Sequence, residues 1–167
     1  MKLSTRTRYA VRAVFDIAFH GEGRATQARD IARRQDVPLR YLEQIFQDLK
    51  RAKIVEGKRG PNGGYSLARA AEGISIGDIV RAMQGPIELL FDDGPSSAES
   101  EAASHRAANG RDGANGNASR SVPATLWKEL AHKVSACFDG VTVRELCKRG
   151  EAAGLHRGDP HGHMYFI

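Results

Sequence analysis

Residues 60–64 have the glycine-rich sequence GPNGG, which is typical of a chain reversal, and a short segment of strand-like pattern lies on each side. Glycine and asparagine adopt the positive φ values that tight hairpin turns require. We therefore predict two antiparallel strands, at about 54–59 and 64–67, joined by this turn. The remaining apolar pattern has helical spacing, so the predicted fold class is mainly α with a small β-hairpin.

Three segments before the hairpin carry apolar residues at the spacing of an α-helix. We predict helices at about 8–19, at 26–35 and at 38–52, with Ser4 or Thr5 as the cap of the first. Pro38 favours the start of the third helix, because its φ is preset for a first helical turn. The side chains predicted to be buried on this third helix are Leu39, Leu42, Ile45, Phe46 and Leu49.

The second half of the chain changes in character. Helices are predicted at about 75–84, where Ser75 and Asp78 have capping-box spacing, and at 123–138, followed by a short helix that Thr142 begins. Between them, residues 92–120 lack every large apolar residue type and contain no cysteine, so they cannot bury enough surface to become ordered. We therefore predict four regions. They are a domain of helices and a hairpin at 1–90, a mobile loop at 91–122, two helices within 123–149 and a flexible tail at 150–167.

Three helices followed by a hairpin are typical of a winged helix-turn-helix, in which the third helix enters the DNA major groove and the hairpin forms a wing. The predicted third helix carries four polar or aromatic residues near its start: Arg40, Tyr41, Glu43 and Gln44. Arg40 suits guanine or phosphate, and Gln44 suits adenine. Glu43 can accept a hydrogen bond from cytosine or repel the wrong base. These side chains are therefore candidate base readers.

Charge supports a nucleic-acid partner for the first region. Residues 1–69 contain fifteen Lys and Arg against seven Asp and Glu, a net charge of +8, whereas the remaining residues sum to −3. In the hairpin, Lys58 and Arg59 precede flexible glycines, and an arginine there suits the narrow minor groove. No apolar stretch is long enough to span a bilayer, and no secretion signal is apparent, so we expect a cytoplasmic protein without a membrane partner.

Four segments resemble the Rrf-type family of bacterial winged helix-turn-helix regulators: residues 3–11, 41–46, 59–67 and 126–130. The resemblance implies a homodimer on a near-palindromic DNA operator, and we expect a repressor. The helix at 123–138 would then be the dimerisation helix. By position, the resemblance carries DNA contact to Arg40, Tyr41, Glu43 and Gln44, and to the wing residues Arg59, Gly60, Gly63 and Gly64.

Family members that sense through an iron–sulfur cluster place three cysteines in the loop before the long helix, and this chain has none there. Hydroxyl and amide groups are poor cluster ligands, so we expect no cofactor at that position. The sequence does not identify the signal, and three kinds stay open: a small-molecule effector, a thiol modification or a protein effector. The alternative is a redox or metal-cofactor sensor that uses Cys137 and Cys147. No nucleophile–base pair, phosphate-cradling loop or metal-binding spacing indicates an enzyme.

Overall fold

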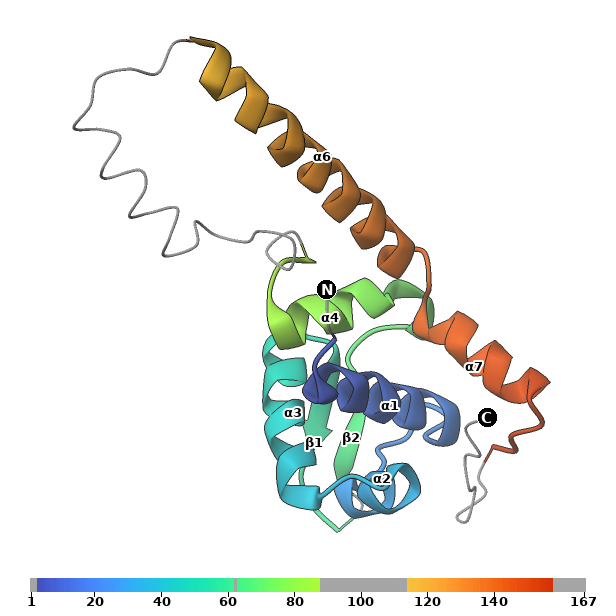
Figure 1. Ribbon diagram of the computed structural model, residues 1–167. Helices are drawn as coiled ribbons and strands as arrows, with labels where there is room; N and C mark the ends of the chain where they lie inside the picture. Colours follow the sequence, from blue (N-terminus) through green and yellow to red (C-terminus); the bar gives the residue numbers. More distant parts are fainter. Residues whose placement is uncertain (1–2, 62, 88–113, 158–167) are drawn as a thin grey trace. The chain divides into compact units, whose positions relative to one another are not determined.

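The computed structural model describes residues 3–61, 63–87 and 114–157, with side chains of the last range from Thr125 onward (Figure 1). The elements are α1 (Thr5–His20), α2 (Ala28–Gln35), α3 (Leu39–Arg51), β1 (Val55–Lys58), β2 (Gly64–Leu67), the 3-10 turn η1 (Ala71–Gly73), α4 (Ile76–Gln84), α6 (Ala114–Asp139) and α7 (Val143–Ala152). The described residues are mainly helical with one hairpin, as predicted. The chain divides into two compact units, Pro86–Ala136 and Lys2–Gly85 together with Cys137–Ile167.

Side-chain caps fix where the helices begin. The hydroxyl of Ser4 accepts a hydrogen bond from the Thr7 backbone N–H at 3.1 Å, so α1 begins earlier than the apolar pattern alone predicts. Ser75 and Asp78 form the predicted capping box at the start of α4, with reciprocal bonds of 3.0 and 3.1 Å. Thr142 caps α7 by accepting from the backbone N–H of Glu145. Local sequence signals therefore set these three boundaries.

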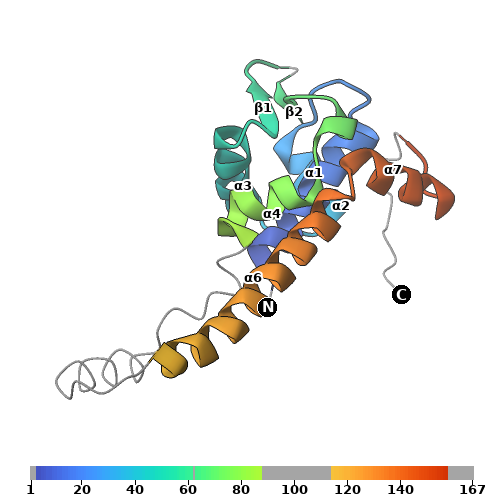
Figure 2. The same cartoon turned by 90° about the horizontal axis from the view of Figure 1, so that it is seen from above.

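The larger unit is built around α1, which packs against α2, α3, α4 and α7. Figure 2 shows these helices gathered together, with the hairpin projecting at one end. On α3, Leu42, Ile45, Phe46 and Leu49 are fully buried, as the helical spacing predicts. Leu39 is only half-buried, because it lies in the first turn at the margin of the core. The buried stripe of α3 therefore leaves its opposite face to solvent.

The hairpin is attached to the helices in two ways. Tyr65 of β2 exchanges two backbone hydrogen bonds of 2.8 Å with Thr26, which lies just before α2. A Cβ at Gly64 would lie 2.3 Å from the carbonyl oxygen of Thr26, so only glycine permits this approach. The ring of Tyr65 also stacks on Phe46 of α3, with 3.9 Å between centroids. The wing is thus fixed to both helices of the helix-turn-helix.

The C-terminal helix corrects one prediction. Residues 150–167 were expected to form a flexible tail, but α7 continues to Ala152, and residues 158–167 lie outside the described residues. Gly150 explains the extension, because a Cβ there would lie 3.1 Å from the Phe15 ring of α1. The absence of a side chain lets α7 lie directly on α1, and this packing stabilises the last turns of α7.

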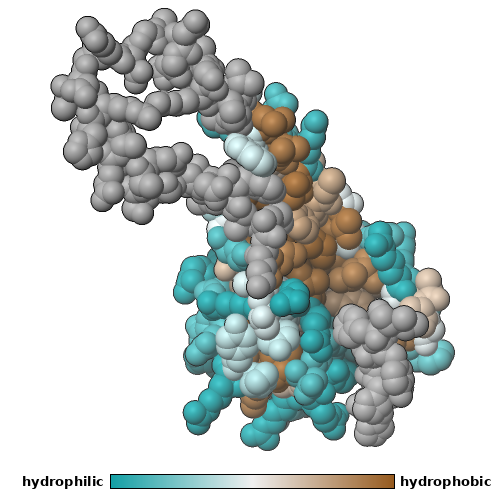
Figure 3. Space-filling model, viewed as in Figure 1, coloured by the Kyte–Doolittle hydropathy of each residue, from teal (hydrophilic) through white to brown (hydrophobic). Residues whose placement is uncertain are grey.

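Helix α6 also differs from the prediction. It begins at Ala114 instead of near Pro123, so the last part of the predicted loop is helical, whereas residues 88–113 lie outside the described residues. The helix includes Gly116 and Pro123, two residue types of low helix propensity in a helix interior, so the local pattern favours a later start than the one observed. Two large apolar side chains of α6, Leu126 and Trp127, are 52% and 53% exposed. In Figure 3, atoms coloured as hydrophobic lie along this helix.

Candidate nucleic-acid interface

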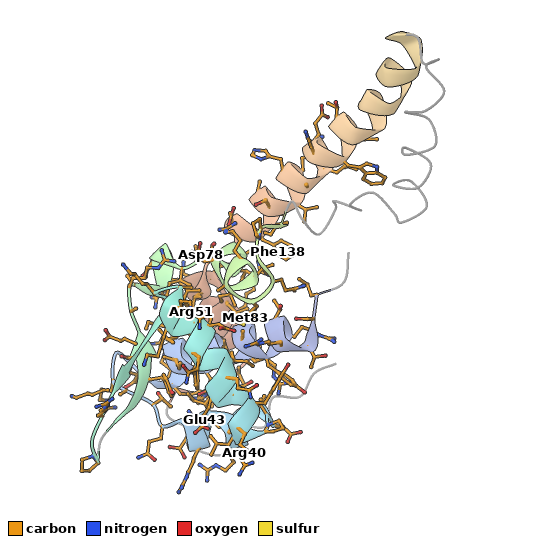
Figure 4. All side chains as sticks on the ribbon, turned by 90° about the vertical axis from the view of Figure 1, so that its left-hand side faces the viewer. Arg40, Glu43, Arg51, Asp78, Met83 and Phe138 are labelled. Atoms are coloured by element: carbon orange, nitrogen blue, oxygen red, sulfur yellow. The ribbon has the colours of Figure 1, made fainter. Side chains whose placement is uncertain are left out.

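A groove of about 540 Å³ lies between the start of α3 and the hairpin. Its walls come from the residues before and within the first turn of α2, from α3 and from the wing. The lining residues that the sequence selected as DNA contacts are Glu43, Arg59, Gly60, Gly63 and Gly64. Figure 4 shows Arg40 and Glu43 together at the N-terminal end of α3. The fold therefore brings the predicted reading helix and the predicted wing to one side of the unit.

The remaining predicted readers lie outside the groove lining. Arg40 and Gln44 are exposed on α3, as a base-reading side chain must be. Tyr41 is half-buried, and its ring meets the ring of Tyr9 edge to face with 5.9 Å between centroids. Only part of Tyr41 is thus available to a ligand, because its ring also packs against α1.

Two further cations line the groove beside Lys58 and Arg59 of the wing, and neither is among the predicted contacts. They are Arg29 of α2 and Lys50 of α3. All four are exposed, and none forms a salt bridge within the described residues. Glu43 is the one carboxylate among the described lining residues. The net charge of the first 69 residues indicated a basic surface, but it could not select these four side chains. Such a basic groove attracts a polyanion.

Tyr65 forms part of the groove floor. Its pKa is raised above the ordinary value, first by burial and then by the negative charge of Glu43. The hydroxyl, protonated at neutral pH like that of any tyrosine, is a hydrogen-bond donor. Because the ring is stacked on Phe46, this donor has a fixed position beside the acidic reader.

The two cysteines have different surroundings. Cys147 of α7 is buried, and burial raises the pKa of its thiol, which keeps it protonated. Cys137 of α6 is exposed. Among the described residues, no group of three or more His, Cys, Asp or Glu side chains could hold a metal ion. With two cysteines in the whole chain and one of them in the core, the residues do not fit an iron–sulfur cluster.

The matching family model is Rrf2, described as an iron-dependent transcriptional regulator, and it aligns with residues 3–149. The chain belongs to the Rrf2 family. It is 33% identical to the HTH-type transcriptional regulator IscR of Vibrio campbellii over an alignment of 151 residues. This alignment covers 90% of this chain and 80% of the relative. It is 30% identical over 173 residues to IscR of Erwinia tasmaniensis, which covers 99% of this chain and 94% of the relative.

Solved structures agree with this assignment. IscR of T. potens has 28% sequence identity and a TM-score of 0.65, covering 95% of this chain and 94% of that chain. CymR (YrzC), described as the global cysteine regulator of B. subtilis, has 29% identity and a TM-score of 0.63, covering 89% and 98%. The predicted family resemblance and the winged-helix fold are thereby confirmed, and this Rrf2 protein is a DNA-binding transcriptional regulator. None of the helices in the described part of the chain meets the length and hydropathy needed to cross a membrane.

Proposed function

We propose that this Rrf2 protein is a sequence-specific repressor that binds a near-palindromic DNA operator as a homodimer. The observation that carries the proposal is the groove between α3 and the wing, where four exposed cations stand beside the candidate base readers. Unpaired cations neutralise phosphates, and exposed side chains at the start of a helix reach base edges. Both functions are needed to find DNA and then to read it.

In this proposal, the first turns of α3 lie in a major groove. Arg40 contacts guanine or phosphate, and Gln44 contacts adenine. Glu43 discriminates between sequences by accepting a hydrogen bond from cytosine or by repelling other bases. The accessible part of Tyr41 contacts the DNA backbone or a base. Arg59 enters the adjacent minor groove, where the wing backbone at Gly60, Gly63 and Gly64 approaches the DNA without side-chain obstruction.

The dimer in this proposal is formed through α6. Leu126 and Trp127 present large apolar surfaces on one helix, and their burial against a second copy would be favourable. A two-fold protein requires half-sites related by the same symmetry and spaced by about one helical turn or a small multiple. Because DNA is the ligand, the proposal places the protein in the cytoplasm with the chromosome, and it assigns no enzymatic activity.

The proposal includes no iron–sulfur cluster, so the signal is a small-molecule effector, a protein effector or a thiol modification. The alternative, a redox or metal sensor that uses both Cys137 and Cys147, requires both thiols to reach one ligand. The burial of Cys147 disfavours it, because the core around α7 would have to open. Protein purified without oxygen should therefore be colourless and free of bound iron. A coloured, iron-containing preparation would support the alternative.

The decisive experiment selects bound duplexes from a random DNA pool, with and without oxidant. We expect enrichment of a two-fold symmetric sequence whose half-sites match one subunit each. The same pool reports redox dependence, because a thiol-based signal would change the enrichment when oxidant is present. If no sequence is enriched at low salt, sequence-specific recognition is excluded.

A further inference from the structure

Four side chains on α1 form a row that the groove does not use. Arg6, Tyr9, Arg12 and Asp16 follow one another at intervals of three, three and four residues, which places them on one face of the helix. Their partners lie on the two helices of the helix-turn-helix, α2 and α3. We call these four residues the α1 polar row.

One end of the α1 polar row holds the last turn of α2. The carboxylate of Asp16 is fully buried and accepts hydrogen bonds from Arg34 Nε at 3.0 Å, from Arg34 Nη2 at 2.6 Å and from Gln35 Nε2 at 2.9 Å. Arg12 donates to the backbone carbonyl oxygen of Gln35 and, from Nε, to its Oε1 at 3.3 Å. Both residues that end α2 are therefore bound through directional polar contacts.

The other end of the row holds α3 at two places. Arg6 forms an ion pair with Asp48 in the second half of α3. Tyr9 meets Tyr41 in the first turn of α3, edge to face. The guanidinium of Arg12 lies over the Tyr9 ring, with 5.5 Å from Cζ to the centroid, so the contacts to α2 and to α3 are continuous. The row thus joins the end of α2 to both halves of α3.

Such contacts determine orientation more than they add stability. Removing charges from water costs about as much as pairing them returns, so well-packed apolar residues would stabilise the same interface equally well. Hydrogen bonds with fixed geometry favour one relative orientation of two helices, whereas apolar packing tolerates several. That orientation decides where α3 presents Arg40, Glu43 and Gln44 with respect to the end of α2.

We propose that the α1 polar row, with Arg34, sets the orientation of α3 against α2 and thereby determines discrimination between operator and other DNA. Arg6, Arg12 and Arg34 are then positioning residues and not phosphate ligands, although all three belong to the basic region of the sequence. The inference rests on the proposed operator recognition. Arg6 and Asp48 suit the test, because their side chains are 38% and 20% exposed and their loss leaves no fully buried charge.

The experiment compares the wild type with Arg6→Gln and with a matched control, Lys58→Gln. The control removes a groove cation that forms no salt bridge with any residue the structure describes. Affinity is measured over a range of salt for a duplex selected by the wild type and for a random-sequence duplex of equal length. Arg6→Gln should weaken selected-duplex binding by about tenfold, leave random-duplex binding unchanged and keep the same salt slope. Lys58→Gln should weaken both and reduce the slope by about 0.9.

A second variant, Asp48→Asn, separates positioning from charge, because the two explanations predict opposite changes in DNA affinity. Removing a negative charge should tighten DNA binding if electrostatics alone governs affinity, whereas loss of positioning should weaken binding to the selected duplex. Two outcomes would overturn the inference. One is a salt slope for Arg6→Gln that falls as much as that of Lys58→Gln. The other is unchanged binding of the selected duplex in both Arg6→Gln and Asp48→Asn. If the wild type selects no duplex, the proposed function fails separately, and the random-duplex slopes still decide the role of Arg6. Thermal unfolding checks that each variant is folded.

Discussion

The wing groove and the α1 polar row use the same residue types in opposite ways. In the groove, Arg29, Lys50, Lys58 and Arg59 are exposed and form no salt bridge within the described residues, so they are available to a polyanion. In the row and its contacts, the arginines are bound to partners on neighbouring helices. The same excess of positive charge thus serves ligand binding in one region and internal geometry in the other. The surroundings of each charge, and not the number of charges, decide its function.

The largest effect is expected at the buried end of the row. Asp16→Ala removes the partner of Arg34, whose side chain is 10% exposed, and leaves a largely buried charge without compensation. We expect a loss of about 3–5 kcal/mol in the free energy of unfolding, measured by urea denaturation. Replacing both partners, Asp16→Leu with Arg34→Met, should recover most of that loss. A loss below about 1 kcal/mol in the single variant would show that the pair is not buried as the structure indicates.

The next largest effect is expected in the groove. Arg59→Ala should weaken DNA binding by about 1–3 kcal/mol if Arg59 makes a specific minor-groove contact, and its free energy of unfolding should not change. Fluorescence anisotropy with the selected duplex measures the loss. Arg149→Ala is the control, because Arg149 is exposed on α7, pairs with Glu145 and does not line the groove. Equal losses in the two variants would mean that the groove has no special role.

Glu43→Ala should produce a smaller loss of affinity and a broader sequence preference. An acidic side chain among four cations does not attract phosphates, so its contribution is to exclude unfavourable sequences. Repeating the selection from a random pool with this variant should yield a more degenerate operator. Glu43→Gln keeps the shape and removes the charge, so it separates repulsion from hydrogen bonding. An unchanged operator in both variants would remove Glu43 from the set of readers.

The smallest effect is expected in the pH dependence of stability. It concerns the ion pairs of Arg81 with Asp78 and Asp139, which are partly exposed and lie outside the groove. Hydrogen bonding to Arg81 lowers the pKa of Asp139. For Asp78, burial acts to raise the pKa, but the Ser75 backbone N–H, Arg81 and Arg69 lower it overall. Both carboxylates therefore stabilise the fold above the unfolded-state pKa of about 4, and this contribution is lost as the pH falls through the lower folded-state values.

Because these side chains are partly exposed, we expect no more than about 1 kcal/mol from this source. The free energy of unfolding should fall between pH 5 and pH 3 more steeply in the wild type than in Arg81→Gln. Chemical denaturation at a series of pH values measures both slopes. Parallel slopes would mean that the Arg81 pairs contribute nothing to acid sensitivity.

Much of the fold follows from short-range patterns. Helical spacing placed α1 to α4 within a few residues, and the cap signal at Ser75 fixed the start of α4. Of the two predicted caps of α1, Ser4 and Thr5, the structure uses Ser4. The glycine-rich turn placed the hairpin. The predicted start of α6 was wrong, because Gly116 and Pro123 have low helix propensity in a helix interior and the helix nevertheless includes them.

The candidate site was predictable in part. Exposure of Arg40, Glu43 and Gln44 follows from helical spacing once the buried stripe of α3 is known. The participation of Arg29 and Lys50 does not, because it requires the first turn of α2 and the middle of α3 to face the wing. The α1 polar row had a visible signal, four polar or aromatic residues on one helix face. The charge count of residues 1–69 includes Arg6 and Arg12, so by composition alone they are counted among the DNA-binding charges.

The order of the elements, the turn chemistry of the wing and the shortage of thiols for a cluster all follow from the sequence. Each of them depends on residues that are close together in the chain or on the number of residues of one type. Which cations face solvent and which are bound to a neighbouring helix depends instead on how the helices pack. Pairing such as that of Arg6 with Asp48 joins residues more than forty positions apart. A charge finds such a partner only after apolar packing has brought α1 and α3 together.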